Sequence, residues 1–259
     1  TAVLAWTYLG QFHAAEDGKF DPEYEAADAA AALATIVERV APGDAAIEQV
    51  VVNDLPARAL LEQSADADLL VVGARGVGRI RGALLGSVSQ QCALHATVPI
   101  AIIRDDDAGN AGGDRPERVL VGVDGSDTSQ RALVWAAAEA QARDAILTVV
   151  HAWQPFVVAF DAMPVVTDVD FEGEGRRLVA EQLAAASLDG FADDRLEVIV
   201  VPDSPAAAVL DAAEDATLLV VGSRGRGGFA SLLLGSVSQH VIQNAPCPVV
   251  VLPPEGKTR

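Results

Sequence analysis

Two glycine-rich segments of this chain share a spacing that suits an anion. In each segment an apolar run, LLVV, ends at a glycine, and the pattern G-x2-G-x9-G-S follows. The glycines are Gly73, Gly76 and Gly86 in the first segment and Gly222, Gly225 and Gly235 in the second. Glycine lets a backbone approach a ligand closely. A glycine loop that enters a helix also presents free N–H groups and the positive end of the helix dipole, which together favour phosphate.

The residues around these glycines support the same chemistry. Ser87 and Ser236 follow the last glycine of each motif and are predicted to be helix N-caps, because serine favours that position. Each loop also carries an arginine, Arg75 or Arg224, which could pair with a bound anion. One alternative is a glycine-rich turn that binds nothing, with its arginine facing solvent. Two copies with an identical spacer favour the anion site.

The two motifs belong to an internal repeat. A shift of 149 residues places 54–105 on 203–254 without a gap, with 24 identities in 52 positions, and Thr1–Trp6 matches Thr148–Trp153 at a shift of 147. The second repeat starts earlier, with the apolar segment 118–123 and a helical segment, 129–143, that the first repeat lacks. We therefore predict a first domain at 1–104 that is incomplete at its N-terminus, an acidic, glycine-rich linker at 105–117, and a second domain at 118–259.

Strand and helix patterns alternate along both repeats. We expect strands at 1–6, 47–53, 69–73, 99–104 and 118–123, and helices at 25–40, 56–64, 87–96 and 129–143. The complete repeat reads βαβαβαβαβ, which predicts an α/β fold: a doubly wound, mostly parallel, five-stranded open sheet. In such sheets ligands bind beyond the carboxyl ends of the strands. The segments VGVDGS, TVVHAW, VPDSP and GSRGRGG would all end at that edge.

Each repeat ends in an apolar strand, Pro99–Arg104 or Pro246–Leu252. An apolar strand at the edge of a sheet needs a partner. We expect these two strands to pair antiparallel within the chain and so to form an internal pseudo-dimer. Association of two chains into a further homodimer stays open.

Composition narrows the classes of partner and site. The net charge is −19, which argues against nucleic acid and anionic membranes as partners. Cys92 and Cys247 fit no metal or redox spacing and are interpreted as small apolar fillers in a reducing, cytoplasmic protein. No histidine has metal-ligand spacing; His151 is expected to line the ligand site or to pack beside it. Trp6 and Trp153 are expected to anchor the core.

The motifs carry a resemblance to a family. The segment VGVDGS at 121–126 and the repeated G-x2-G-x9-G-S, each followed by Val-Ser, resemble the ATP-binding branch of the tandem universal stress proteins. The resemblance implies two tandem domains of the adenine-nucleotide α-hydrolase type. It also implies a cytoplasmic, stress-linked regulatory protein that binds ATP, with Mg²⁺ accompanying the triphosphate. No catalytic residue is predicted, and at most slow ATP hydrolysis is implied.

The resemblance also assigns binding residues. In the second repeat it implies that Asp124 holds the adenine and ribose end of the nucleotide, and that Asp124 is the candidate for a metal contact once nucleotide is bound. The remaining residues of that site are Gly122, Ala152, Gly222, Arg224, Gly225, Gly235, Ser236, Val237 and Ser238. The first repeat matches at Ala5, Gly73, Arg75, Gly76, Gly86, Ser87, Val88 and Ser89, and it has no counterpart of Gly122 or Asp124.

Two other functions stay open. The chain could be an ATPase or an adenylate-transferring enzyme of the related superfamily, although beyond Asp124 and Asp203 no base or metal-binding carboxylate pair stands out. It could also be an interaction protein that keeps the fold and binds no nucleotide. The intact, repeated glycine motif favours the nucleotide-binding regulator.

Overall fold

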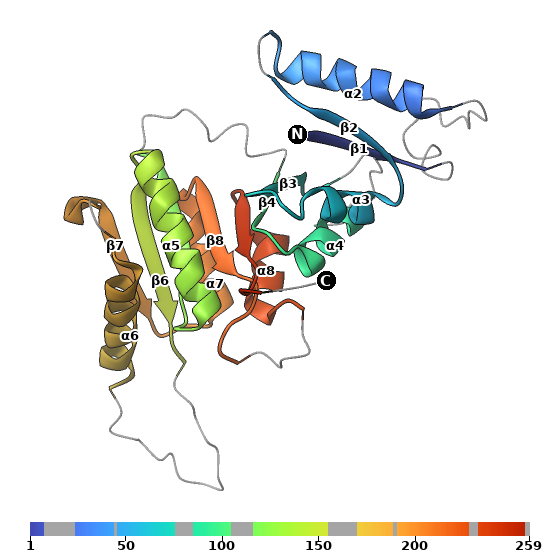
Figure 1. Ribbon diagram of the computed structural model, residues 1–259. Helices are drawn as coiled ribbons and strands as arrows, with labels where there is room; N and C mark the ends of the chain where they lie inside the picture. Colours follow the sequence, from blue (N-terminus) through green and yellow to red (C-terminus); the bar gives the residue numbers. More distant parts are fainter. Residues whose placement is uncertain are drawn as a thin grey trace, which may run out of the picture.

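A computed structural model describes residues 1–7, 24–43, 46–75, 85–104, 116–154, 170–188, 191–227 and 233–256, in which strands and helices alternate (Figure 1). The first repeat contains β1 (Ala2–Trp6), α2 (Ala26–Val40), β2 (Gln49–Asn53), α3 (Pro56–Gln63), β3 (Leu70–Gly73), α4 (Ser87–His95) and β4 (Ile100–Ile103). The second contains β5 (Arg118–Gly122), α5 (Asp127–Ala142), β6 (Ile146–Ala152), α6 (Phe171–Ala186), β7 (Leu196–Val201), α7 (Pro205–Ala212), β8 (Leu218–Gly222), α8 (Ser236–Asn244) and β9 (Val249–Leu252), with short 3-10 turns at Asp193–Arg195 and Ala213–Asp215. The expected strands and helices are all present. Most of the predicted linker, 105–115, lies outside the described residues.

Seven strands form one sheet in the order β3-β4-β9-β8-β5-β6-β7. All neighbouring strands are parallel except β4 and β9. The second repeat supplies five of these strands in the order β9-β8-β5-β6-β7, with β5 in the middle. The predicted α/β fold with a mostly parallel, doubly wound sheet is confirmed.

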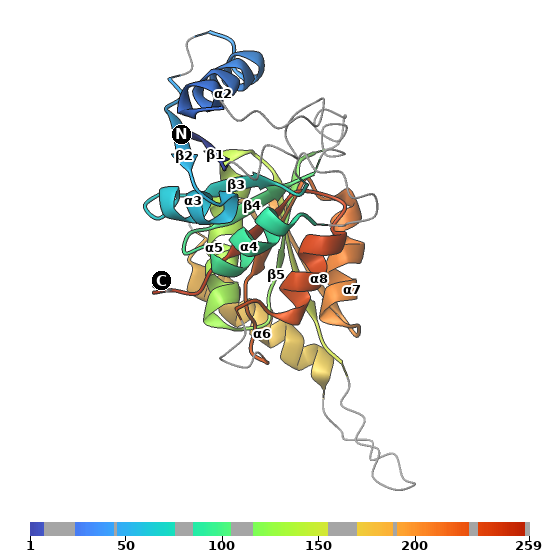
Figure 2. The same ribbon diagram turned by 90° about the vertical axis from the view of Figure 1, so that its right-hand side faces the viewer.

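The helices cover both faces of this sheet. Because strand side chains alternate between faces, Val119 and Val121 of β5 pack with Leu133 of α5, whereas Leu120 packs with Val209 of α7 and Ile242 of α8. Figure 2 shows α7 and α8 side by side. All six of these strand and helix side chains on the two faces are buried, so the sheet is the centre of two apolar layers.

The last strands of the two repeats pair antiparallel, as the sequence predicts. Ile100 lies opposite Val251, and Ile102 lies opposite Val249. All four side chains are buried and belong to one core that both repeats share. Arg104 extends the junction, because its Nη2 donates a hydrogen bond of 2.7 Å to the carbonyl of Ile242 in α8.

The first repeat departs from a single sheet. Strands β1 and β2 form a separate, parallel, two-stranded sheet, on which α2 packs through the buried Ala29 and Leu33. In the second repeat β5 lies between β8 and β6 and is hydrogen-bonded to both. Among the described residues no strand takes that place between β3 and β1. The first domain therefore divides into two sheets.

Both cysteines are buried, as their interpretation as apolar fillers requires. Cys92 of α4 is 0% exposed and Cys247 is 2% exposed. Burial raises the pKa of the Cys92 thiol to about 11. Since the thiolate is the reactive form, the thiol should be almost inert at neutral pH.

We predict that a thiol-specific reagent labels the native chain at least about 100-fold more slowly than the chain in denaturant. Absorbance of the released chromophore at pH 7.5 measures both rates, and denaturant should expose two thiols per chain. A Cys92→Ser variant should release one. Equal rates in the two states would contradict the burial.

Candidate functional site

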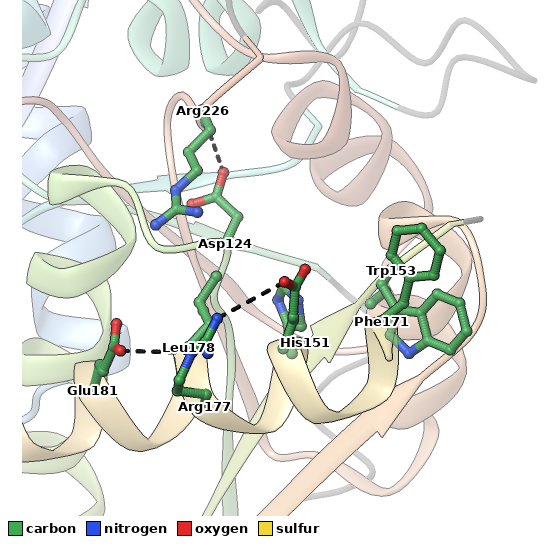
Figure 3. A pocket seen from close by; sticks show the side chains of 11 residues that line it. Asp124, His151, Trp153, Phe171, Arg177, Leu178, Glu181 and Arg226 are labelled. Carbon is green, nitrogen blue, oxygen red and sulfur yellow. Dashed lines mark hydrogen bonds and ion pairs between the residues drawn. The ribbon is translucent and has the colours of Figure 1, made fainter. Parts of the chain in front are cut away.

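A cavity of about 670 Å³ opens beyond the carboxyl ends of β5 and β6 (Figure 3). Three sources line it: the strand ends, α6, and the glycine loop that follows β8. The lining residues are Asp124, His151, Ala152, Trp153, Phe171, Glu174, Gly175, Arg177, Leu178, Glu181 and Arg226. The structure thus brings Asp124 and Ala152 together at the edge of the sheet where the sequence predicts a ligand.

The Asp124 carboxylate joins the end of β5 to the glycine loop. Its Oδ1 accepts hydrogen bonds from the backbone N–H of Ser126 at 3.0 Å and from the Ser126 hydroxyl at 2.7 Å. Its Oδ2 accepts the backbone N–H of Arg226 at 2.8 Å. A Cβ at Gly225 would lie 2.1 Å from Oδ2, so only glycine fits beside this carboxylate. Asp124 therefore connects two loops that are about one hundred residues apart in the chain.

These contacts keep the carboxylate ionised. Burial by itself raises the pKa of Asp124, but the hydrogen bonds from Ser126 and from the Arg226 backbone outweigh it. The pKa of Asp124 therefore lies below its ordinary value. A carboxylate that accepts several N–H and O–H groups is stabilised in its charged form.

Arg226 supplies a cation that the sequence reasoning missed. Gly125 has a φ of +80°, which glycine adopts at little cost. A Cβ there would lie 2.1 Å from Nη2 of Arg226, so the guanidinium lies directly against this turn. At the shift of 149 the first repeat has Val77 at this position. Reasoning from residues that both repeats share therefore selected Arg224 instead.

His151 lines the cavity, as expected. Its Nδ1 lies 2.9 Å from the carbonyl oxygen of Val123. Because a carbonyl only accepts, Nδ1 carries the hydrogen in this contact. The ring edge faces α6 at Gly175, where a Cβ would lie 2.9 Å from Cδ2 and 3.4 Å from Nε2 of the histidine. The glycine in α6 thus makes room for the imidazole beside the cavity.

Trp153 lies at the rim of the cavity, and neither Trp153 nor Trp6 is fully buried, which corrects their assignment as core anchors. Trp153 stacks on Phe171, the first residue of α6, with ring centroids 5.5 Å apart and an angle of 14° between the planes. Trp6 meets Tyr24, just before α2, edge to face at 5.7 Å. Each pair joins the end of a strand, β6 or β1, to the start of the helix that follows. A sequence signal existed: each tryptophan stands at the end of a predicted strand, where the chain leaves the sheet.

The motif loops close on their strands in the same way in both repeats. Gly235 N–H donates to the carbonyl of Ser223, and Gly86 N–H donates to that of Ala74, both at 2.7 Å. The hydroxyls of Ser238 and Ser89 donate to the carbonyls of Gly222 and Gly73, both at 2.6 Å. The buried serine two positions after the helix start therefore holds the loop to the strand.

The prediction that Ser87 and Ser236 are N-caps is wrong. The N-cap residues are Gly86 and Gly235, with extended backbones, and the serines occupy the first helical position. The reason is a backbone hydrogen bond. The N–H groups of Gly86 and Gly235 bond to the residues just after β3 and β8, which holds each glycine at the end of the loop, and the helix begins one residue later. Ser236 and Ser87 are exposed at the helix starts. Their role in ligand binding stays a prediction.

The other predicted site residues lie in several different parts of the structure. Gly122 lies against Val209, where a Cβ would approach Cγ2 of the valine to 3.1 Å, and Gly222 packs on Thr128 of α5. Val237 lies in the first turn of α8 and Val88 in that of α4. Ala5 is on β1, in a different sheet from Gly73. Gly76 lies outside the described residues, and Arg75 is exposed next to them.

Within the described ranges no group of three or more His, Cys, Asp or Glu side chains could hold a metal ion. Each helix of those ranges is too short or too polar to span a bilayer.

We predict that Asp124→Asn destabilises the chain by about 1–3 kcal/mol, because the amide N–H₂ must face one of the N–H donors that the carboxylate now accepts. Urea unfolding measures the free energy. Since the folded pKa of Asp124 is depressed, its contribution is present above the unfolded pKa and is lost as the pH falls through the folded pKa. Asp124→Asn should therefore flatten the acid side of the stability profile.

The exposed Asp211 of α7 provides a matched control, because Asp211→Asn removes the same charge from the surface. Its free energy of unfolding should stay within about 0.5 kcal/mol of the wild type. Equal losses of unfolding free energy in the two variants would show that Asp124 stabilises the chain only through its charge and not through its hydrogen bonds.

Comparison with known proteins places the chain in a family. The model of the universal stress protein family matches residues 2–104 and again 116–253. Universal stress protein Rv2623 of Mycobacterium tuberculosis is 40% identical over 204 residues, which cover 74% of this chain and 63% of that protein. Universal stress protein Mb2028c of Mycobacterium bovis is 36% identical over 205 residues, or 79% of this chain and 68% of that protein. The chain thus spans about two thirds of the length of these relatives.

Solved structures agree in fold. A universal stress protein from Archaeoglobus fulgidus matches with a TM-score of 0.60 and 25% identity, and the match covers 91% of this chain and 83% of that one. The family model covers both repeats, and the relatives in the two mycobacteria share more than a third of the aligned residues. The chain belongs to the universal stress protein family, with two tandem domains of that family.

Proposed function

We propose that the second repeat binds ATP and that the chain acts as a nucleotide-dependent regulator in a stress response. The observation that carries the proposal is the junction at Asp124, which holds the glycine loop beside a nucleotide-sized cavity. Ligand pockets commonly have volumes of about 300–1,000 Å³, and this cavity has about 670 Å³. Membership of the family supports the stress-related role.

The charges around the cavity suggest how a nucleotide would lie. Arg226 and the start of α8 are on the glycine-loop side, and both favour the phosphates. On the opposite side Arg177 of α6 lies 3.9 Å from Glu174 and 3.9 Å from Glu181. Figure 3 shows the dashed contact between Arg177 and Glu181. Carboxylates there would repel phosphate and accept hydrogen bonds from hydroxyl or amino groups. The ribose and base would therefore lie toward α6, which differs from the contact with Asp124 that the family resemblance implies.

Magnesium would accompany the triphosphate. Mg²⁺ commonly uses phosphate oxygens with one or two carboxylates and retained waters, and Asp124 is the carboxylate that lines the loop side of the cavity. Both Asp124 oxygens accept hydrogen bonds from the protein. A contact through water, which preserves these bonds, suits this carboxylate better than direct coordination.

Slow hydrolysis or adenylate transfer is the second candidate function. His151, with Nδ1 bonded to a carbonyl, could accept a hydrogen bond at Nε2 from a group in the cavity. An interaction protein without nucleotide is the third candidate. Mass spectrometry of ligand released from the purified protein separates the three functions: ATP supports the regulator, ADP or an adenylated product supports the enzyme, and no nucleotide supports the interaction protein.

We predict that Gly235→Val weakens ATP binding at least about tenfold, because a side chain on the N-cap blocks close approach to the helix start. A Cβ at Gly235 already lies 3.4 Å from the Ser223 carbonyl and 3.5 Å from Cα of Arg224. Isothermal titration calorimetry with Mg-ATP measures the affinity. The matched change in the first repeat, Gly86→Val, should leave it within about twofold. Unchanged affinity in Gly235→Val would remove the loop from the site.

We also predict that Arg226→Ala lowers ATP affinity about tenfold and makes binding less dependent on salt, because a charge partner of the phosphates is lost. Arg224→Ala tests the arginine that the repeated motif selects. Calorimetry at two salt concentrations gives both quantities. Arg176→Ala, on the outer side of α6 in an ion pair with Glu172, is the control. If Arg226→Ala keeps the affinity and salt dependence of the wild type, the guanidinium lies outside the phosphate site.

A further inference from the structure

The imidazole of His151 uses only one of its two nitrogens within the protein. The residue stands near the end of β6, beside α6, and lines the cavity (Figure 3). Its Nδ1 lies 2.9 Å from the carbonyl oxygen of Val123, which places the ring hydrogen on Nδ1. In the neutral imidazole the other nitrogen, Nε2, is then a hydrogen-bond acceptor. The backbone just after β5 thus fixes the tautomer of a side chain on β6.

The lone pair of Nε2 is open to the cavity. Among the described residues no group bonds to Nε2 of His151, and this nitrogen is not one of their fully buried polar atoms without a partner. The ring itself lines the cavity. A ligand there can therefore reach an acceptor whose hydrogen-bonding role is already set.

Helix α6 leaves room for this ring. Gly175 is buried in the helix, and a Cβ there would lie 2.9 Å from Cδ2 and 3.4 Å from Nε2 of His151. Glycine inside a helix is less favourable than alanine, because it loses more backbone entropy on folding. The space that the imidazole needs gives a physical reason for glycine at this position.

The first repeat has neither residue of this pair. The shift of 147 residues that aligns the two aromatic pairs places His151 on Leu4 and Gly175 on Asp28. A leucine side chain has no lone pair to offer. The imidazole and the space for it therefore occur together in one repeat, which indicates a task that belongs to the second repeat.

We propose that His151 is a specificity-determining residue that selects the base of the nucleotide. Its Nε2 accepts a hydrogen from an exocyclic amino group, so that the second repeat takes 6-aminopurine nucleotides and rejects 6-oxopurine nucleotides. This inference rests on the proposed nucleotide function and deepens it. The glycine loop and Arg226 favour phosphates, which all nucleotides share, whereas His151 reads the base.

The other groups on the α6 side favour the same class of base. Glu174 and Glu181 line the cavity, and ionised carboxylates only accept hydrogen bonds. An adenine amino group has two hydrogens, so it can donate to Nε2 and to a second acceptor. The oxygen of a 6-oxopurine would instead bring lone pairs against the lone pair of Nε2. If that oxygen turned toward Arg177, Nε2 would be left without a donor, which is unfavourable once water is excluded.

The test combines a deletion in the ligand with a deletion in the protein. Calorimetry at about pH 8, where imidazole is ordinarily neutral, compares Mg-ATP with the magnesium complex of purine riboside triphosphate, which has hydrogen in place of the amino group. His151→Phe keeps a flat ring and removes the acceptor. We expect the wild type to prefer ATP about tenfold, and His151→Phe to bind both ligands within about twofold. Inosine triphosphate should bind the wild type more weakly than purine riboside triphosphate does.

A second variant keeps the histidine and moves it. The Cβ of Gly175→Ala would displace the ring, so the preference for ATP should fall below about threefold. His95→Phe, at the exposed end of α4 in the first repeat, is the matched control and should keep the preference of the wild type. The ratio of two affinities within one variant does not depend on the fraction of folded protein, so a loss of stability cannot imitate the result.

Nitrogen NMR of the wild-type chain with labelled histidine examines the tautomer without any nucleotide. The ring signals of His151, assigned by their loss in His151→Phe, should show the hydrogen on Nδ1. ATP should then shift the Nε2 signal, whereas purine riboside triphosphate should leave it nearly unchanged.

The outcomes separate this inference from the nucleotide function. Equal affinity of the wild type for ATP and its analogue, an unchanged preference in His151→Phe, or a hydrogen on Nε2 in the free protein would each overturn the role of His151, while ATP binding stands. If adenosine binds with the expected preference over purine riboside but Mg-ATP does not bind, the proposed ATP function fails and the selection by His151 stands. If no purine binds, both are wrong.

Discussion

The central position of β5 is the constraint on which the second repeat depends. This strand is hydrogen-bonded to β8 on one side and to β6 on the other, and its buried side chains contribute to both apolar layers. The described strands of the first repeat divide between two sheets. Backbone N–H and C=O groups at the interior of a sheet need partners on both sides. A parallel sheet therefore keeps its continuity only where each inner strand is present.

The strand that holds the sheet together also builds the site. Beyond its carboxyl end, Asp124 accepts hydrogen bonds from its own turn and from the loop after β8. The depressed pKa of Asp124 is a consequence of those bonds. The cavity is formed where this junction meets His151 and the start of α6. Sheet order and ligand geometry thus have one common cause, since adjacent parallel strands deliver their ends to the same edge.

The pairing of β4 with β9 makes one apolar core from two repeats. Ile100, Ile102, Val249 and Val251 are all buried at this junction. Each repeat would otherwise expose an apolar edge strand, which favours association with other chains. The chain as a whole has a net charge of −19. The apolar junction and the arginines of the glycine loop therefore differ in charge from the acidic chain around them.

Much of the molecule is determined by the sequence alone. Apolar periodicity, glycine spacing and the internal repeat predict the strands, the helices, the antiparallel junction and the family, because these features depend on local patterns and on comparison within the chain. The tertiary structure alone decided which residues meet. It placed Arg226 against Gly125, put Trp153 on Phe171 at the cavity, made Gly235 the N-cap, and separated β1 from β3. Each of these depends on contacts between segments distant in the chain, and spacing along one strand or helix carries no information about them.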